Sequence, residues 1–317
     1  MLESCMRPEL VAEITLQPVR RYGVDAAVLY SDIMLPLKAV GVELDIVSGR
    51  GPVIARPILT AADLDQLQPL DPARLWYVSE AIGLIISQLG DVPLIGFAGA
   101  PFTLASYLVE GGPSRDYAAT KALMIDEPAL WHEMCTRLAD LSAAFLSLQA
   151  AAGATVVQLF DSWAGSLSPA EYRQYAQPYS ERVLAGLAGA GVPRIHFGVG
   201  TSELLELMGA AGAEVIGVDW RLPLAEASRR LGHHYALQGN LDPALLSVSW
   251  PVLSERVREV ISSGAVAPGH IFNLGHGVPP DADPAVLARI VELVHTEGPQ
   301  LRRTAREQLA ASAADGR

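Results

Sequence analysis

Seven apolar runs of strand length recur along this chain, and each ends in polar or Gly-rich residues before a helix-like stretch begins. The runs are AAVLYSD (26–32), VPLIGFAGAPF (92–102), TVVQLFDSW (155–163), RIHFGVG (194–200), EVIGVDW (214–220), YALQGN (235–240) and HIFNLGHG (270–277). Such alternation indicates parallel strands joined by crossover helices. The interior of each run is nearly free of charge, which is typical of strands covered on both faces. The pattern therefore predicts an α/β fold of the (β/α)8 TIM-barrel type.

A barrel of this type needs eight strands, so one strand remains to be placed. The segment before the first run, RPELVAEITLQPVRRYGV, has the apolar spacing of an amphipathic helix. Its proline, Pro18, predicts that the helix breaks or ends near its last turn. The sequence thus opens with a helix that has no strand before it. We expect a barrel whose first strand is missing from this chain, and the alternative is a seven-stranded or open sheet.

The length of 317 residues suits one barrel with insertions. We expect a single catalytic domain over residues 1–298, followed by a helical tail over residues 299–317. Between the first two runs the chain is too long for one crossover. The segment 42–58 predicts a β-hairpin around Ser-Gly-Arg-Gly, and a helix is expected from about residue 72 to residue 89.

Composition narrows the possible partners and the compartment. The net charge of −12 repels nucleic acid and anionic membrane surfaces, so neither is expected as a partner. Two cysteines, Cys5 and Cys135, argue against a disulfide framework and favour a reducing compartment. The uncharged stretch at 92–109 contains two prolines and two glycines, which favours a strand, a loop and a helix start over a membrane span. Without a visible signal peptide, the sequence predicts a cytoplasmic protein.

Polar side chains mark the points where the predicted strands end, and in a barrel these ends and their loops form the active site. The set is Asp32, Asp161, Ser162, Asp219, Asn240 and His276. Asp32 is the strongest candidate for a functional residue among them, because the apolar segment IMLPL follows it. A carboxylate in such surroundings costs several kcal/mol unless cations or hydrogen-bond donors meet it. The alternative for Asp32, an N-cap of the next helix, is weakened by Pro36 and Gly41.

Two other site types find little support in the sequence. FGVGTSELLELMG followed by Asp219 resembles a dinucleotide fingerprint, but Glu203 stands at the third glycine position. His270 and His276, six residues apart on one strand, would lie ~20 Å apart and could not share a metal ion. No cysteine falls in a strand-end loop, so we expect no zinc site.

Six segments, taken together and in order, resemble the uroporphyrinogen decarboxylase family over about residues 3–297. They are YSDIMLPLKAVGVELDIVSGRGP, GAPFTLASYLVEGG, QLFDSWAGSLSP, VDW, LQGNLDP and FNLGHGVPPDADP. The resemblance implies a (β/α)8 barrel, usually a homodimer, that acts as a carboxy-lyase. Its members convert uroporphyrinogen III to coproporphyrinogen III in haem biosynthesis, removing four acetate carboxyl groups as CO2 without a metal or other cofactor.

The same resemblance assigns roles to individual residues. It implies that Asp32 is the catalytic aspartate and binds the pyrrole N–H groups at the centre of the macrocycle. It implies further that Tyr107, Ser162 and His276 contact the substrate. The source of the proton that must be added to carbon stays open between an arginine, a substrate carboxylic acid and water.

The family pattern also begins with an Arg-rich strand and loop, approximately Met-Arg-Gln-Ala-Gly-Arg, which this sequence does not show ahead of its first helix. The substrate carries eight carboxylates, so Arg50, Arg56 and Arg115 become candidate cations in place of those arginines. Alternatives to an active decarboxylase are an inactive tetrapyrrole-binding remnant and a zinc-dependent methyltransferase of the same superfamily. A nucleotide-dependent oxidoreductase would depend on the glycine motif alone.

Overall fold

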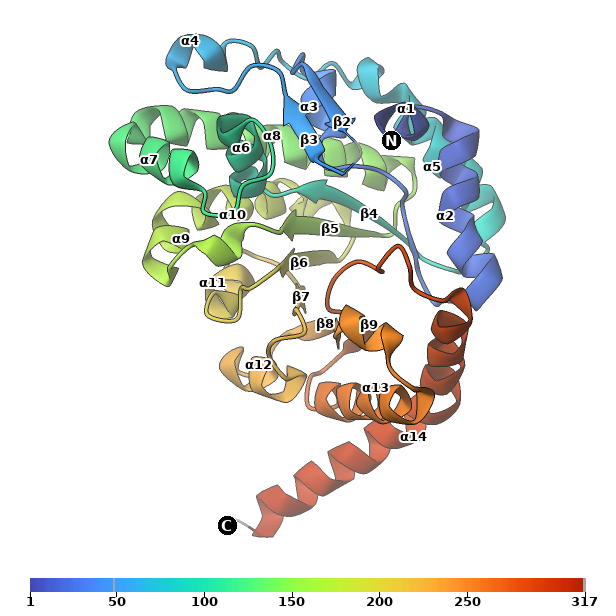
Figure 1. Cartoon of the computed structure of the whole chain (residues 1–317). Helices are drawn as coiled ribbons and strands as arrows, with labels where there is room; N and C mark the ends of the chain where they lie inside the picture. Colours follow the sequence, from blue (N-terminus) through green and yellow to red (C-terminus); the bar gives the residue numbers. More distant parts are fainter. Residues whose placement is uncertain (48, 316–317) are drawn as a thin grey trace.

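The computed structural model describes residues 1–47 and 49–315, and its centre is a curled sheet of seven parallel strands (Figure 1). Neighbouring strands in the sheet follow one another along the chain, apart from the excursion after the first. Their order is β1 (Ala27–Val28), β4 (Leu94–Gly99), β5 (Val156–Asp161), β6 (Arg194–Gly198), β7 (Val215–Gly217), β8 (Ala236–Leu241) and β9 (His270–Leu274). Each predicted run forms one of these strands, so the α/β prediction is confirmed.

The two faces of the sheet bury different side chains. The inner face of the curl holds a small apolar cluster around Ile95, Ile195 and Val215. Above this cluster Phe97 and Phe160 meet edge-on, with ring centroids 5.2 Å apart. The outer face packs against the helices in the main core, and β4 is buried along its whole length. The absence of charge within the runs follows from this double coverage.

The sheet is open between β1 and β9, which form its two edges and do not pair with each other in the described part of the chain. Val28 on β1 and Ile271 on β9 are 49% and 39% exposed. The helix layer continues across this opening, because α14 (Pro284–Asp315) packs against α2 (Pro8–Tyr22). The expected barrel-type arrangement with seven strands from this chain is therefore what the structure has.

The amphipathic helix predicted before the first strand is present, but the break expected from Pro18 is not. Helix α2 continues through Pro18 to Tyr22 and ends at Gly23, which adopts the left-handed conformation. Pro18 lies on the exposed side of the helix, between the exposed residues Gln17 and Arg20 on the same surface. Water can therefore solvate the carbonyl that Pro18 leaves unbonded, and the helix tolerates the proline.

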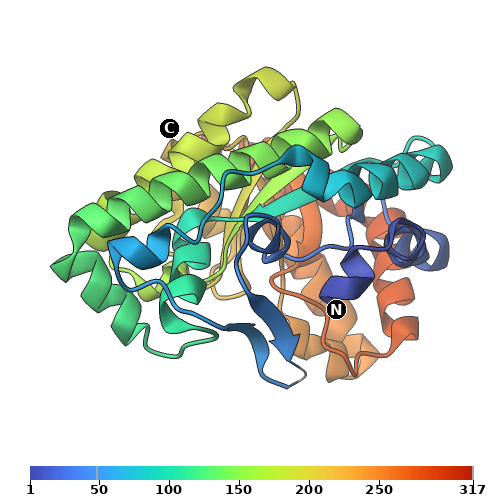
Figure 2. The same ribbon diagram turned by 90° about the horizontal axis from the view of Figure 1, so that it is seen from above.

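The hairpin and helix predicted between the first two strands of the sheet are both present. Strands β2 (Leu44–Val47) and β3 (Gly51–Ile54) pair antiparallel, while Ser48 of the predicted turn lies outside the described residues. Figure 2 shows this hairpin projecting from one side of the molecule. A 3-10 turn, η1 (Pro72–Leu75), leads into α5 (Trp76–Leu89).

The remaining helices cover the outside of the sheet or connect its loops. They are α1 (Leu2–Cys5), α3 (Leu35–Ala39), α4 (Ala61–Leu64), α6 (Pro101–Glu110), α7 (Ala118–Asp126), α8 (Pro128–Ala152), α9 (Pro169–Tyr175), α10 (Gln177–Gly186), α11 (Leu205–Ala210), α12 (Leu224–Arg230) and α13 (Trp250–Gly264), with the 3-10 turns η2 (Ala164–Ser166), η3 (Ala188–Ala190) and η4 (Pro243–Ser247). Helix α14 runs unbroken through Pro299 and leaves the body of the molecule (Figure 1). The predicted domain boundary after residue 298 falls inside this helix, and that division stays a prediction. Among the described residues no helix combines the length and apolarity needed to cross a membrane.

Candidate active site

The loops that follow the carboxyl ends of the strands gather at one end of the sheet, and the four residues singled out for the site all lie there. Asp32 follows β1, Tyr107 lies in α6 after β4, Ser162 follows β5 directly, and His276 follows β9. They come from four separate βα units, as active-site residues of barrels do. Their surroundings divide them into two groups.

Asp32 is half-buried in the loop between β1 and α3. Its Oδ1 accepts a hydrogen bond from the backbone N–H of Met34 at 2.8 Å, which closes a tight turn. Helix α3 begins one residue later with Met34 as its N-cap, so Asp32 is not the cap of that helix. Burial raises the pKa of Asp32, while the Met34 N–H and the positive amino terminus oppose the rise.

The loop that carries Asp32 approaches the end of β4 closely. A Cβ atom added to Gly99, the last residue of β4, would lie 3.1 Å from Cβ of Ile33 and 2.7 Å from a methyl carbon of Leu104. A larger residue at position 99 would require Ile33 to shift by a few tenths of an ångström and the Leu104 side chain to move, so glycine favours this close approach. The segment that carries Asp32 is therefore fixed against the start of α6, the helix that contains Tyr107.

Tyr107 lies within α6, in the helix rather than in the loop before it. Burial raises its pKa to about 12, and the negative charge of nearby Asp32 contributes to the rise. The Tyr107 ring packs on Trp163 with centroids 3.8 Å apart, and Tyr117 meets Trp163 at 5.1 Å. Because Ser162 precedes Trp163, the fold brings Asp32, Tyr107 and Ser162 to one side of the strand ends.

The turn that carries Ser162 is fixed by two contacts. The backbone N–H of Trp163 donates to Oγ1 of Thr103 in α6, at 3.3 Å. A Cβ atom on Gly165 would collide with the carbonyl oxygen of Val199 in the loop after β6. The loops after β5 and β6 are therefore in backbone contact, which only a glycine at position 165 allows.

His276 belongs to a second group, on the β7–β9 side of the strand ends. It is exposed in the loop after β9, and its ring meets Trp220 edge-on with centroids 6.3 Å apart. The described contacts of His276 do not include Asp32, Tyr107 or Ser162. Its position at the mouth fits the predicted substrate contact, which stays a prediction.

Arg221 was not predicted from the sequence, and it provides a cation on the Trp220 ring, which His276 also meets. Its guanidinium pairs with Asp219 and lies over the Trp220 ring at 4.1 Å. The Arg221 side chain is 49% exposed, whereas that of Asp219 is 1% exposed. One side of the guanidinium is thus held by protein and the other faces solvent. Its position one residue after the VDW run was the signal that could have identified it.

Asp219 fixes the loop after β7 through its hydrogen bonds. It accepts from the backbone N–H of Gly200 at 2.5 Å and from that of Arg221 at 3.1 Å, besides pairing with the Arg221 guanidinium. Asn240 fixes the same loop by donating to the Asp219 carbonyl at 2.8 Å. Asp219 is buried and already accepts three hydrogen bonds from protein, so it is poorly placed to be the ribose-binding acid that the dinucleotide alternative requires.

The three arginines proposed as cations lie on the hairpin and on the loop after α6. Strand β3 rests on that loop, where the Ile54 N–H donates to the Gly111 carbonyl at 2.9 Å. Arg56 faces Glu43 at 3.9 Å, and both side chains are well exposed. Neither Arg56 nor Arg50 nor Arg115 contacts the strand-end residues in the described structure, and their roles stay predictions.

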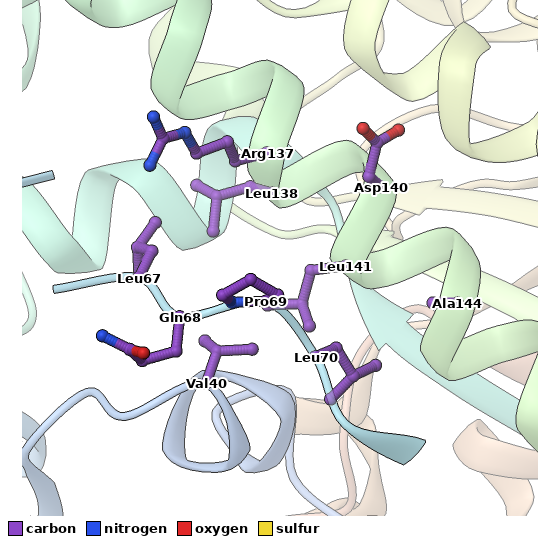
Figure 3. A pocket seen from close by; sticks show the side chains of 10 residues that line it. All are labelled: Val40, Leu67, Gln68, Pro69, Leu70, Arg137, Leu138, Asp140, Leu141 and Ala144. Atoms are coloured by element: carbon purple, nitrogen blue, oxygen red, sulfur yellow. The ribbon is translucent and has the colours of Figure 1, made fainter. Parts of the chain in front are cut away.

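A separate cavity of about 460 Å³ lies between α8 and the segment before η1 (Figure 3). Its lining is mostly apolar and consists of Val40, Leu67, Gln68, Pro69, Leu70, Arg137, Leu138, Asp140, Leu141 and Ala144. None of the four candidate site residues lines it. In the described part of the chain, no three His, Cys, Asp or Glu side chains converge as metal ligands would.

Comparison with known proteins gives consistent matches. The family model described as uroporphyrinogen decarboxylase (URO-D) matches residues 1–297. The uroporphyrinogen decarboxylase of Salinispora tropica is 63% identical over 295 residues, covering 93% of this chain and 80% of that protein. That of Streptomyces coelicolor is 62% identical over 297 residues, covering 94% and 84%.

Solved structures with a similar fold include two proteins of low sequence identity. A methyltransferase from Methanosarcina mazei has a TM-score of 0.74 at 18% identity, over 92% of this chain and 86% of that one. A B12-independent methionine synthase from Shewanella sp. W3-18-1 has a TM-score of 0.57 at 11% identity, over 96% and 89%. These two likenesses concern the fold alone.

Proposed function

This chain belongs to the uroporphyrinogen decarboxylase family, and we propose that it removes the four acetate carboxyl groups of uroporphyrinogen III as CO2, giving coproporphyrinogen III in haem biosynthesis. The observation that carries the proposal is the family match over residues 1–297. The half-buried carboxyl group of Asp32, held beside Tyr107 at the strand ends, agrees with it. The enzyme would be a carboxy-lyase that uses no cofactor.

The substrate can supply the electron sink that decarboxylation needs. Protonation of the ring carbon beside an acetate substituent gives a delocalised iminium-type cation. The bond between the acetate CH2 carbon and its carboxylate carbon then breaks. Its electron pair forms an exocyclic methylene group, and CO2 leaves. Protonation of that methylene and loss of the added ring proton restore the pyrrole, so each carboxyl group is replaced by hydrogen overall.

The role that we propose for Asp32 is to stabilise that cation. Burial alone favours the neutral acid, as the raised pKa of Asp32 indicates. Pyrrole N–H groups that donate to the carboxyl group would favour its ionised form. A fixed carboxylate in a partly desolvated site then stabilises positive charge on the rings without having to reorganise.

Local groups would have to bind the eight carboxylates, because the net charge of −12 repels the substrate at long range. Tyr107 and Ser162 can donate hydrogen bonds on one side of the strand ends. On the other side the exposed face of Arg221 and the imidazole of His276 can do so. The two groups thus offer donors on both sides of the position over which the macrocycle would lie.

The experiment is an anaerobic incubation of the protein with uroporphyrinogen III, followed by oxidation and separation of the porphyrins by carboxyl count. We expect stepwise loss of carboxyl groups down to the four of coproporphyrin. Binding of porphyrinogen with no loss of carboxyl groups over long incubation would instead favour the inactive remnant. Stoichiometric bound zinc in the purified protein would favour the methyltransferase.

We propose further that the protein is a cytoplasmic homodimer. Support for the compartment comes from Cys5 and Cys135, both of which are free and buried, as in proteins of reducing compartments. Support for the homodimer is the family resemblance. Sedimentation equilibrium would test it, and a concentration-independent monomer mass would contradict it.

A further inference from the structure

A fully buried polar cluster lies on the outer face of the sheet, behind the loop that carries Ser162. Asp161, the last residue of β5, and His196 on β6 both have 0% exposure. Helices contribute Thr103 from α6 and Tyr172 from α9, which are also fully buried. The mechanism described above uses none of these side chains, although isolated polar groups are costly to bury.

Two atoms of this cluster face each other without a hydrogen-bond partner in the described structure. They are Oδ2 of Asp161 and Nε2 of His196, which lie 4.0 Å apart. His196 uses its other ring nitrogen, Nδ1, with the carbonyl oxygen of Met208 at 3.3 Å. Because a carbonyl only accepts, Nδ1 must carry the hydrogen, which leaves Nε2 as a bare acceptor. At 4.0 Å the two atoms are too far apart for a hydrogen bond, but a protonated Asp161 turns a neutral O–H group rather than a negative charge towards that lone pair.

The other oxygen of Asp161 connects the cluster to the proposed active site. Oδ1 accepts from the Thr103 hydroxyl at 3.0 Å, and the Thr103 oxygen accepts from the Trp163 N–H at 3.3 Å. Trp163 in turn supports the Tyr107 ring, with centroids 3.8 Å apart. Ser162 lies in the chain between Asp161 and Trp163. The buried carboxyl group is thus two hydrogen bonds from the turn that carries Ser162 and supports the Tyr107 ring.

The surroundings of Asp161 favour its neutral form. Burial raises the pKa of Asp161 to about 7 and lowers that of His196 to about 4. The other titratable groups facing it are Tyr172 on α9 and Cys135 on α8, whose pKa values burial also raises. Among the described residues, Asp161 forms no ion pair with a Lys or Arg. Ionisation would therefore bury a negative charge with no cation to offset it.

We propose that Asp161 is a positioning residue whose neutral form, facing His196 and bonded to Thr103, holds the Ser162–Trp163 turn in place for substrate binding. Ionisation strengthens the hydrogen bond from Thr103 but sets a negative Oδ2 against the Nε2 lone pair of His196. The carboxylate therefore moves away from His196, and the turn and the Tyr107 ring lose their fixed geometry as the proton leaves. The roles of Ser162 and Tyr107 rest on the proposed function, but the coupling between Asp161 and Trp163 does not.

The test that needs no activity uses fluorine-labelled tryptophan and nuclear magnetic resonance. The Trp163 resonance is assigned by its absence in Trp163→Phe. In the wild-type protein we expect it to shift with pH around the titration of Asp161, and to lose that shift in Asp161→Asn. The amide of asparagine can still accept from Thr103 but does not ionise. A resonance that does not respond to pH in the wild type, or that titrates equally in Asp161→Asn, would overturn the coupling.

The kinetic test asks whether the coupling serves catalysis. We expect wild-type kcat/KM for uroporphyrinogen to fall about tenfold as Asp161 ionises, mainly through KM, which corresponds to one pKa unit of differential interaction. Asp161→Asn should remove that fall, whereas Asp91→Asn, at an exposed aspartate before β4, should retain it. Thr103→Val should raise KM at all pH values and Thr103→Ser should restore it.

The outcomes separate this inference from the proposed function. A protein that removes no carboxyl groups disproves the function, while the Trp163 resonance still decides the coupling. If the protein is active and Thr103→Val leaves KM unchanged, or Asp161→Asn retains the fall, the positioning role is wrong.

Discussion

At the scale of single residues, Asp32 and Asp161 show how position sets the task of a carboxyl group. Both end a strand run, and burial raises the pKa of both. Asp32 is half-buried and receives one backbone N–H, which leaves it open to donors from a substrate. Asp161 is fully buried against a neutral imidazole, where a charge has no partner. The first is suited to stabilise a cation, and the second to hold structure.

The burial of Asp161 predicts a pH dependence of stability. Its pKa is about 7 in the folded protein against an ordinary value of 3.8, so the folded state holds the proton more tightly. Its contribution to stability is therefore full below about pH 4 and is lost as the pH rises to about 7. Relative to Asp161→Asn, the wild-type free energy of unfolding should fall by up to about 4 kcal/mol across that range. Urea unfolding at several pH values measures it.

His196 provides the opposite slope as an internal control. Its folded pKa of about 4 lies below the ordinary value of 6.5, so its contribution is present above that value and is lost as the pH falls. His196→Gln should therefore gain stability relative to the wild type towards acid pH. If the free energy of unfolding varied with pH in the same way for the wild type, Asp161→Asn and His196→Gln, the two groups would not titrate as their burial requires.

Arg221 carries a prediction about substrate affinity. Arg221→Ala removes an exposed guanidinium that is preorganised by Asp219 and Trp220. Since a hydrogen bond to a charged group contributes roughly 1.5–3 kcal/mol, KM for uroporphyrinogen should rise about tenfold or more, with kcat little changed. Arg256→Ala, which removes an exposed arginine paired with Glu259 on α13, is the matched control. Equal KM values in Arg221→Ala and Arg256→Ala would show that Arg221 does not bind the substrate.

At the scale of elements, the site depends on loops that approach closely through glycine. Gly165→Ala should displace the turn at Ser162, because its Cβ would meet the Val199 carbonyl. Overpacking of this kind costs about 1–3 kcal/mol of stability, and activity should fall more than stability alone explains. Thermal unfolding and turnover measured side by side test this. Gly189→Ala has open space around its Cβ and should change neither; a similar loss there would mean that the close approach is not the cause.

The strands could be predicted because charge is excluded from a sheet covered on both faces. Polar residues at strand ends likewise indicated Asp32, Ser162 and His276. Sequence spacing did not indicate that an exposed Pro18 would leave α2 intact, since exposure depends on the packing of the helix. The position of Asp161 close to His196 depends on the register of β5 against β6, which aligns Leu159 with His196. That register is a property of the folded sheet.

At the scale of the whole molecule, an open sheet is enclosed by a continuous layer of helices. His295 on α14 contacts Asp25, just before β1, at 2.9 Å, so the ends of the helix layer meet. Inside the helix layer, β1 and β9 each have one unpaired edge in the described structure. The centre of the sheet, by contrast, is paired on both sides.

This arrangement predicts uneven protection of backbone amides. Amides of β1 and β9 should exchange with deuterium well before those of β5 and β6, because edge strands open locally at lower free energy. Hydrogen exchange followed by mass spectrometry can compare peptides that cover each strand. Equal protection of all four strands would show that the edges are covered in solution.

The most direct test of the central claim is the turnover of Asp32→Asn on uroporphyrinogen III, measured together with porphyrinogen binding. The variant keeps the shape of the side chain and loses the charge. If a carboxylate at position 32 stabilises the ring cation, turnover should fall by roughly 10²–10³, the loss typical when one preorganised stabilising group is removed. Binding should be largely retained, and Asp91→Asn should match the wild type. Near-normal turnover in Asp32→Asn would contradict the proposed role of Asp32.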